Sequence, residues 1–100
     1  MEREEFIEIF ERNHDEYLKF DKISDKPYDS PDLCAFHMIY QFLKKEYRHK
    51  DIIGAAEHDE IYLCDLDELD LTNLTEDVII YLIRCGVRYS EDFGSFCMFV

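Results

Sequence analysis

Residues 51–83 carry ten carboxylates and no Lys or Arg, yet branched and aromatic apolar residues are threaded between the acids. The carboxylates are Asp51, Glu57, Asp59, Glu60, Asp65, Asp67, Glu68, Asp70, Glu76 and Asp77. Disordered acidic tails lack the apolar residues that offset the entropy of an ordered chain. Here such residues recur from Ile61 to Ile83. The pattern therefore predicts an acidic surface whose shape is fixed by a folded core.

The negative charge is divided unevenly along the chain. Residues 1–50 hold 12 acids and 9 Lys or Arg, net −3, and residues 51–100 hold 12 acids and 2 Lys or Arg, net −10, which together give −13. A charge of this size repels nucleic acid and anionic lipid and attracts basic surfaces. We therefore expect no direct binding to nucleic acid and no membrane association, and we expect a basic protein as partner. The ordinary alternative is a solvated face that only keeps the protein soluble.

Length and composition suit one domain over residues 1–100. Apolar residues make up 47% of the chain and aromatic residues 15%, as in globular proteins. The acidic first residues do not resemble a signal peptide, and no apolar run approaches the ~20 residues that span a bilayer. These features predict a soluble, intracellular protein of the cytoplasm.

The cysteines are widely separated and form no Cys-x-x-Cys pair: Cys34, Cys64, Cys85 and Cys97. Each has apolar neighbours in the sequence, which predicts small buried side chains in a reducing compartment. A zinc site could combine Cys34 and His37 with His58 or Cys64. Such a site would lack the second close pair of ligands that structural zinc sites have. We therefore expect no metal and no cofactor.

Apolar spacing and capping residues predict the first two helices. Residues 2–20 place Phe6, Ile9 and Phe10 on one face with acids mostly opposite. A polar loop follows over residues 21–29. Ser30 and Pro31 then suit the N-cap and first position of a central helix that extends to about residue 47. Its predicted buried stripe is Phe36, Ile39, Tyr40, Leu43 and Tyr47, and the basic cluster at its end is expected to lie near the acidic half of the chain: Lys44, Lys45, Arg48 and Lys50.

A third helix is predicted between Thr75, a good N-cap, and Gly86, which suits the residue after a helix end. Branched residues at 78–83 would also suit a strand, and the flanking caps decide for the helix. Residues 60–65 are predicted as a strand, 51–56 as a short helical turn, and 67–71 as a brief turn of helix. Residues 87–89 and 95–100 read as a hairpin around a turn at 90–94. The expected fold class is α+β, with about three main helices packed on a small antiparallel sheet.

The last strand carries apolar residues on both faces. Phe96, Met98 and Val100 alternate with Cys97 and Phe99. One face can pack on the helices, and the other needs a second cover. We favour a cover from the same chain, with a homodimer through this strand as the alternative, because an exposed apolar edge strand invites pairing.

No motif in the chain indicates a catalytic centre. Counting a calcium loop from Asp65 puts Leu69 and Asp70 where an oxygen ligand and Gly are required. His14 and His58 are each followed by Asp and Glu, and His58 is the better candidate for a base or metal ligand. No nucleophile or oxyanion donor can be assigned to it. We therefore lean against an enzyme.

The sequence thus favours a small interaction protein whose carboxylates dock on a basic partner. One such basic surface is the nucleic-acid-binding site of another protein. In composition it is similar to small acidic inhibitors of phage and mobile-element type. The first alternative is an oligomerising structural or regulatory domain without a charged partner, and the second is a small metal-dependent hydrolase using His58. The residues predicted to bind the partner are Glu57, Asp59, Glu60, Asp65, Asp67, Glu68, Asp70, Glu76 and Asp77.

Overall fold

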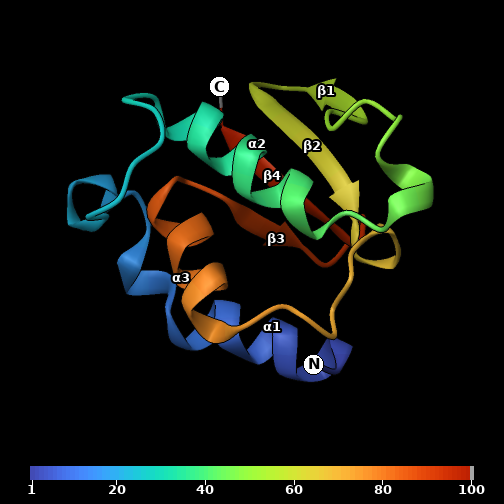
Figure 1. The fold of residues 1–100 in the computed structure, drawn as a ribbon, viewed down its shortest axis with the longest axis horizontal. Coiled ribbons are helices and arrows are strands. Elements are labelled where there is room, and N and C mark those ends of the chain that lie inside the picture. Colours follow the sequence, from blue (N-terminus) through green and yellow to red (C-terminus); the bar gives the residue numbers. More distant parts are fainter. Residues whose placement is uncertain (100) are drawn as a thin grey trace.

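The computed structural model describes residues 1–99 and confirms the α+β fold class (Figure 1). The helices are α1 (Arg3–Arg12), α2 (Pro31–Phe42) and α3 (Glu76–Arg84). The strands are β1 (Ala55–Glu57), β2 (Glu60–Asp65), β3 (Arg88–Ser90) and β4 (Ser95–Phe99), all antiparallel in the order β1-β2-β4-β3. Short 3₁₀ turns occupy His14–Glu16, Phe20–Lys22, Lys45–Tyr47 and Leu66–Glu68.

Helix α1 buries the predicted face but ends earlier than expected. Phe6, Ile9 and Phe10 lie in the core, as the apolar spacing indicated. The helix ends at Arg12 instead of near residue 20. Asn13 follows as the C-cap, and its side-chain amide donates to the carbonyl of Ile9 at 2.9 Å. The backbone N–H of Asn13 donates to the same carbonyl at 3.2 Å, so the side chain reinforces the last helical hydrogen bond before the chain turns away.

Helix α2 begins at Pro31 as predicted, but the prediction that it continues to about residue 47 is wrong. Beyond Phe42 the chain is extended and pairs with a segment distant in sequence. Leu43 bridges to Leu69, and the Lys44 N–H donates to the carbonyl of Glu68 at 2.8 Å. The Asp70 N–H in turn donates to the carbonyl of Phe42 at 2.7 Å. These tertiary hydrogen bonds take the place of the next helical turn.

The buried face of α2 also differs from the predicted stripe. Ile39 and Leu43 are buried, but Tyr40 is 46% exposed and Phe36 is only partly buried. Tyr47 lies in the 3₁₀ turn that follows the helix and is partly buried too. The core positions on the first half of α2 belong to two small residues, Cys34 and Ala35. Because α2 is apolar on most sides, its sequence pattern left the direction of the core poorly defined.

Helix α3 forms between the predicted caps. The hydroxyl of Thr75 caps the first turn. At the other end, the N–H of Gly86 donates to the carbonyl of Ile83 and the N–H of Val87 to that of Leu82, both at 3.0 Å. This pair of bonds is the Schellman motif, which needs a residue with positive φ after the helix. Gly86 supplies it with a φ of 97°.

The prediction of a helical turn at 51–56 is wrong, because residues 55–57 form strand β1. It pairs with β2, the predicted strand at 60–65, through a two-residue turn. The turn residues His58 and Asp59 have φ values of 49° and 64°. Positive φ at both positions is typical of the type I′ turn that matches the twist of a hairpin. Asp and His adopt this conformation more readily than most residues, although neither is the usual Gly.

The C-terminal hairpin forms as predicted, but β4 is not an edge strand. It lies between β2 and β3, so its backbone is paired on both sides. Phe96 and Met98 join the core under the helices, and Cys97 is buried on the opposite face. Phe99 is 58% exposed, with the guanidinium of Arg88 3.9 Å from its ring centre. The free sheet edges are β1 and β3, and a homodimer stays an untested prediction. Val100 lies outside the described residues.

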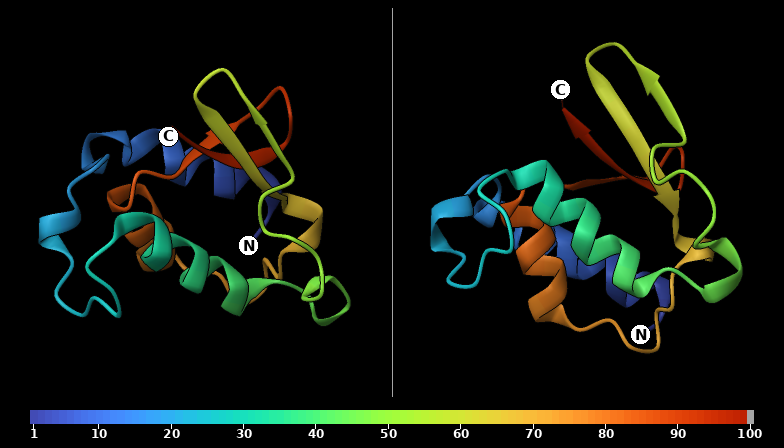
Figure 2. Two further views of the ribbon diagram at one scale, coloured as in Figure 1. Left: turned by 90° about the horizontal axis from the view of Figure 1, so that it is seen from above. Right: turned by 45° about the horizontal axis from the view of Figure 1, so that its top comes forward.

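The helices lie on one side of the sheet, and the β1–β2 hairpin extends beyond them (Figure 2). One hydrophobic core joins all three helices to the inner face of β2 and β4. No helix within residues 1–99 has both the length and the apolar character needed to cross a bilayer. The outer face of the sheet is covered only by its own side chains and by neighbouring loops.

Candidate functional site

The nine carboxylates predicted to bind a partner belong to three segments of the fold. Three surround the turn between β1 and β2, four follow the other end of β2, and two open α3. Strand β2 has six residues, which span about 20 Å at ~3.3 Å per residue. The first two groups therefore lie at opposite ends of a strand (Figure 1), although Glu57, Asp65 and Glu68 line one cavity beside it.

Four of the nine carboxylates form ion pairs with basic residues from outside the acidic stretch. The pairs are Glu60 with Arg88, Asp67 with Arg3 at 3.3 Å, Glu68 with Lys50 at 3.8 Å, and Glu76 with Arg12 at 2.7 Å. The other five have no Lys or Arg partner within residues 1–99: Glu57, Asp59, Asp65, Asp70 and Asp77. The partners are distant in sequence, so a charge count along the chain could not reveal them. Of the predicted basic cluster, Lys50 reaches the acidic half.

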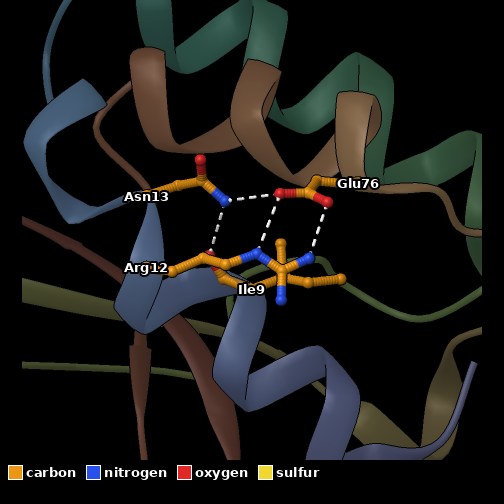
Figure 3. Close-up of polar contacts among 4 residues, drawn as sticks. All are labelled: Ile9, Arg12, Asn13 and Glu76. Atoms are coloured by element: carbon orange, nitrogen blue, oxygen red, sulfur yellow. Dashed lines mark hydrogen bonds and ion pairs between the residues drawn. The ribbon is translucent and has the colours of Figure 1, made fainter.

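The best-formed pair joins the end of α1 to the start of α3 (Figure 3). Arg12 Nη2 and Nε donate to the two carboxylate oxygens of Glu76 at 2.7 and 3.1 Å. Asn13 Nδ2 donates to the same carboxylate at 3.0 Å and to the carbonyl of Ile9. The hydrogen bonds from Arg12, and next those from Asn13, hold the pKa of Glu76 at about 2. This contact fixes the orientation of α1 against α3.

Glu76→Gln is expected to remove a pH-dependent part of the stability. The pKa of Glu76 is about 2 in the folded protein against an ordinary 4.5. The ionised carboxylate therefore stabilises the fold fully above the ordinary value, and this stabilisation is lost as the pH falls through the folded pKa. The urea midpoints of wild type and variant should differ most above that window and converge near its lower end. Asp77→Asn is the control, because Asp77 is next in sequence and forms no ion pair within residues 1–99. Equal acid sensitivity in wild type and Glu76→Gln would contradict the prediction.

A row of carboxylates without ion-pair partners lies along α1. We call Glu2, Glu4, Glu5, Glu8 and Glu11 the α1 carboxylate face; all five are exposed. None of them forms an ion pair within residues 1–99. Both arginines of α1, Arg3 and Arg12, are drawn to Asp67 and Glu76 instead. The sequence placed these glutamates on the polar side of a helix, but the Lys and Arg of residues 1–50 mask their charge in a simple count.

A cavity of about 340 Å³ borders the α1 carboxylate face. Its walls are mostly apolar and come from α1, α3, β3 and the segments between them: Ile7, Phe10, Tyr17, Ile83, Val87 and Tyr89. Glu11 and His14 line it as well. The sequence gives no signal for this cavity because its residues are far apart in the chain. An apolar hollow beside charged residues resembles the anatomy of protein interfaces, which have an apolar centre and a polar rim.

The cysteines and histidines do not assemble a reactive centre. All four cysteines are buried and free, as predicted, and burial raises the pKa of the Cys64 and Cys85 thiols to about 12. Such thiols are poor nucleophiles. His58 lies in the exposed hairpin turn, 3.4 Å from Glu57, where no surrounding walls would hold a substrate. Within residues 1–99, no three His, Cys, Asp or Glu side chains are grouped so that they could hold a metal ion.

Comparison of the chain with protein-family models, with curated proteins and with solved structures finds no match. The features of the molecule that bear on function are the α1 carboxylate face, the cavity beside it, and the remaining carboxylates of residues 51–77.

Proposed function

We propose that the chain is an interaction protein that docks the α1 carboxylate face on a basic surface of another protein. The observation that carries the proposal is the set of five exposed glutamates without ion-pair partners on a helix whose two arginines are held elsewhere. A chain with a net charge of −13 also attracts a basic partner from a distance and raises the rate of encounter. The cavity beside α1 would add apolar contact area to the same interface.

The rigidity of α1 supports this proposal. The helix is anchored at one end by Arg3 to Asp67 and at the other by Arg12 to Glu76. Its apolar side is inserted in the core through Phe6, where the ring is fully buried. The backbone of such a helix loses little conformational freedom on binding, so ordering the glutamate side chains is the main conformational cost.

The spacing of the α1 carboxylates favours a nucleic-acid-binding protein as the partner. Glu4, Glu8 and Glu11 lie at i, i+4 and i+7, which places them on one side of the helix. Neighbours at this spacing are about 5–6 Å apart. Such a row is similar in kind to the regular negative charges of a phosphate backbone. The proposed role is therefore inhibition of a basic site by occupying it.

The proposal is tested with a triple variant, Glu4→Gln, Glu8→Gln and Glu11→Gln. The tagged wild type is used to capture a partner from its own host, and the captured protein is purified for direct binding measurements. We expect a basic partner whose association with wild type slows as ionic strength rises beyond the point where the Debye length is ~8 Å. The triple variant should bind about tenfold more weakly, as expected for the loss of three modest charge contacts.

A matched control separates position from net charge. Asp21→Asn, Asp25→Asn and Asp29→Asn remove the same charge from the exposed loop before α2. This control should bind the partner as wild type does. If both triple variants bound the partner equally weakly, overall charge alone would explain the loss of affinity, and the α1 assignment would be overturned. A captured partner without a basic surface would overturn the proposed function itself.

A further inference from the structure

A second cavity, of about 340 Å³, lies on the outer face of the sheet, and we call it the sheet-face cavity. It is bounded by β1, β2, the start of β4 and the segment before β1. Its charged lining consists of four carboxylates and one lysine, net −3: Asp51, Glu57, Asp65, Glu68 and Lys50. Lys50 lies 3.8 Å from Glu68. Three carboxylates therefore face the cavity without a Lys or Arg partner from residues 1–99.

An aromatic pair forms one wall of this cavity. Tyr62 of β2 and Phe93 of the β3–β4 turn lie with their ring centres 4.6 Å apart and tilted by 51°. Phe93 is among the exposed large apolar side chains of the molecule. Aromatic faces attract cations that approach them, and a planar guanidinium also stacks on them. Carboxylates together with aromatic faces are thus suited to a cation with an apolar stem.

The wall of the cavity contains a buried hydroxyl, that of Ser95, which is free to form a hydrogen bond. Ser95 lines the cavity and is 2% exposed, and its Oγ has no hydrogen-bond partner in the part of the chain that the structure describes. Buried hydroxyls in folded proteins nearly always have a partner. Asp65, its neighbour across the strands, has a raised pKa because of desolvation and, next, the nearby Glu68 carboxylate. A bound donor would satisfy the hydroxyl, and a bound cation would relieve the crowded carboxylates.

The other side of the same aromatic pair already holds an arginine of this chain. A neighbouring cavity shares Tyr62 and Phe93 and contains Arg88. The Arg88 guanidinium forms an ion pair with Glu60, which also accepts from the Tyr62 hydroxyl at 3.1 Å. The Arg88 guanidinium also lies over the ring of Phe99, with its central carbon 3.9 Å from the ring centre. The same face of the sheet therefore already holds one arginine between a carboxylate and an aromatic ring.

We infer that the sheet-face cavity binds the side chain of an arginine presented by a partner protein. The inference rests on the proposed function, since it supplies a specific anchor for a basic partner. A guanidinium offers five donors in a plane, which match several carboxylates and a stacking aromatic better than the compact ammonium of lysine does. Free arginine is a poorer occupant, because its α-carboxylate would enter a negative field.

The test is an NMR titration of the ¹⁵N-labelled protein with a capped Ala-Arg-Ala peptide. Saturable shifts are expected at the amides of Tyr62, Phe93 and Ser95. Phe93→Ala and Asp65→Asn should each weaken binding about fivefold, the size expected for loss of one cation–aromatic or one charge contact. Phe93 is exposed, and Asn can still cap the turn that follows residue 65, so both variants should fold. The matched control is the triple variant Asp21→Asn, Asp25→Asn and Asp29→Asn, whose residues are exposed and lie outside the cavity lining, and it should bind the peptide as wild type does.

Three comparisons decide the assignment. A peptide with citrulline in place of arginine should bind at least about tenfold more weakly, because it keeps the shape without the charge; equal binding would overturn the inference. Equal affinity for a lysine peptide would overturn the preference for guanidinium. Tighter binding of free arginine than of the peptide would overturn the docking role. Failure of peptide binding alongside partner capture that depends on α1 would leave the proposed function standing, so the two can fail separately.

Discussion

Phe6→Ala is expected to lower the free energy of unfolding by about 3–5 kcal/mol. Phe6 is 0% exposed and is the centre of an aromatic cluster that joins α1 to the sheet. Its ring centre lies 5.2 Å from that of Phe10 and 5.7 Å from those of Tyr89 and Phe96. Domains of this size are stable by only ~5–15 kcal/mol. The variant should therefore be largely unfolded at moderate urea, as followed by circular dichroism.

Phe36→Ala is the control for this prediction, because it removes the same side chain from a position that is only partly buried. Its loss should stay below about 2 kcal/mol, since less apolar surface returns to water. Equal losses in the two variants would contradict the difference in burial between Phe6 and Phe36. The sequence pattern placed Phe36 in the buried stripe of the central helix and therefore predicts a large loss for Phe36→Ala as well.

Features set by neighbouring residues could be predicted from the sequence. Thr75 and Gly86 bound α3 because capping depends on hydrogen bonds within one or two turns. The same holds for Ser30 and Pro31, which mark the start of α2. The β2 strand followed from its branched and aromatic residues. These local signals were sufficient for the fold class and for the approximate position of most elements.

Features set by distant residues could not be predicted in this way. Helix α2 stops at Phe42 because residues 42–44 hydrogen-bond to residues 68–70, which no local pattern encodes. Strand β1 exists because β2 offers it a partner; its own residues, Ala55–Glu57, have little strand preference. In both places the tertiary pairing overrides the local propensity.

The candidate site was only partly predicted, because its ion pairs also join residues that are distant in the sequence. The sequence identified the acidic stretch but treated it as one uncompensated surface. Folding brings Arg3 and Arg12 to that stretch, which neutralises part of it and leaves the glutamates of α1 without those partners. Within residues 1–99, carboxylates without a Lys or Arg partner are therefore found on α1 as well as in the acidic stretch. The ion pairs of Arg3 and Arg12 depend on how α1 packs against α3 and the Leu66–Glu68 turn, which a local sequence pattern does not encode.

Ile39→Ala and Tyr40→Ala are adjacent substitutions on α2 that should differ strongly in effect. Ile39 is 1% exposed and belongs to the core cluster, so its truncation should lower the free energy of unfolding by about 2–5 kcal/mol. Tyr40 is 46% exposed, and Arg48 stands 5.9 Å from its ring centre. Its truncation loses a partly solvated contact and should cost below about 1 kcal/mol.

Urea unfolding of the two variants measures the difference in their free energies of unfolding, at neighbouring positions of the same helix. The sequence pattern put both residues in the same buried stripe and predicts two large losses. The structure predicts one large loss, that of Ile39→Ala. Successive residues of a helix point about 100° apart, so only one of the two can face the core when the helix is covered on one side. Similar losses for Ile39→Ala and Tyr40→Ala would mean that α2 is covered on both sides, as in a self-associated form of the protein. Sedimentation of the wild type would then have to show a dimer.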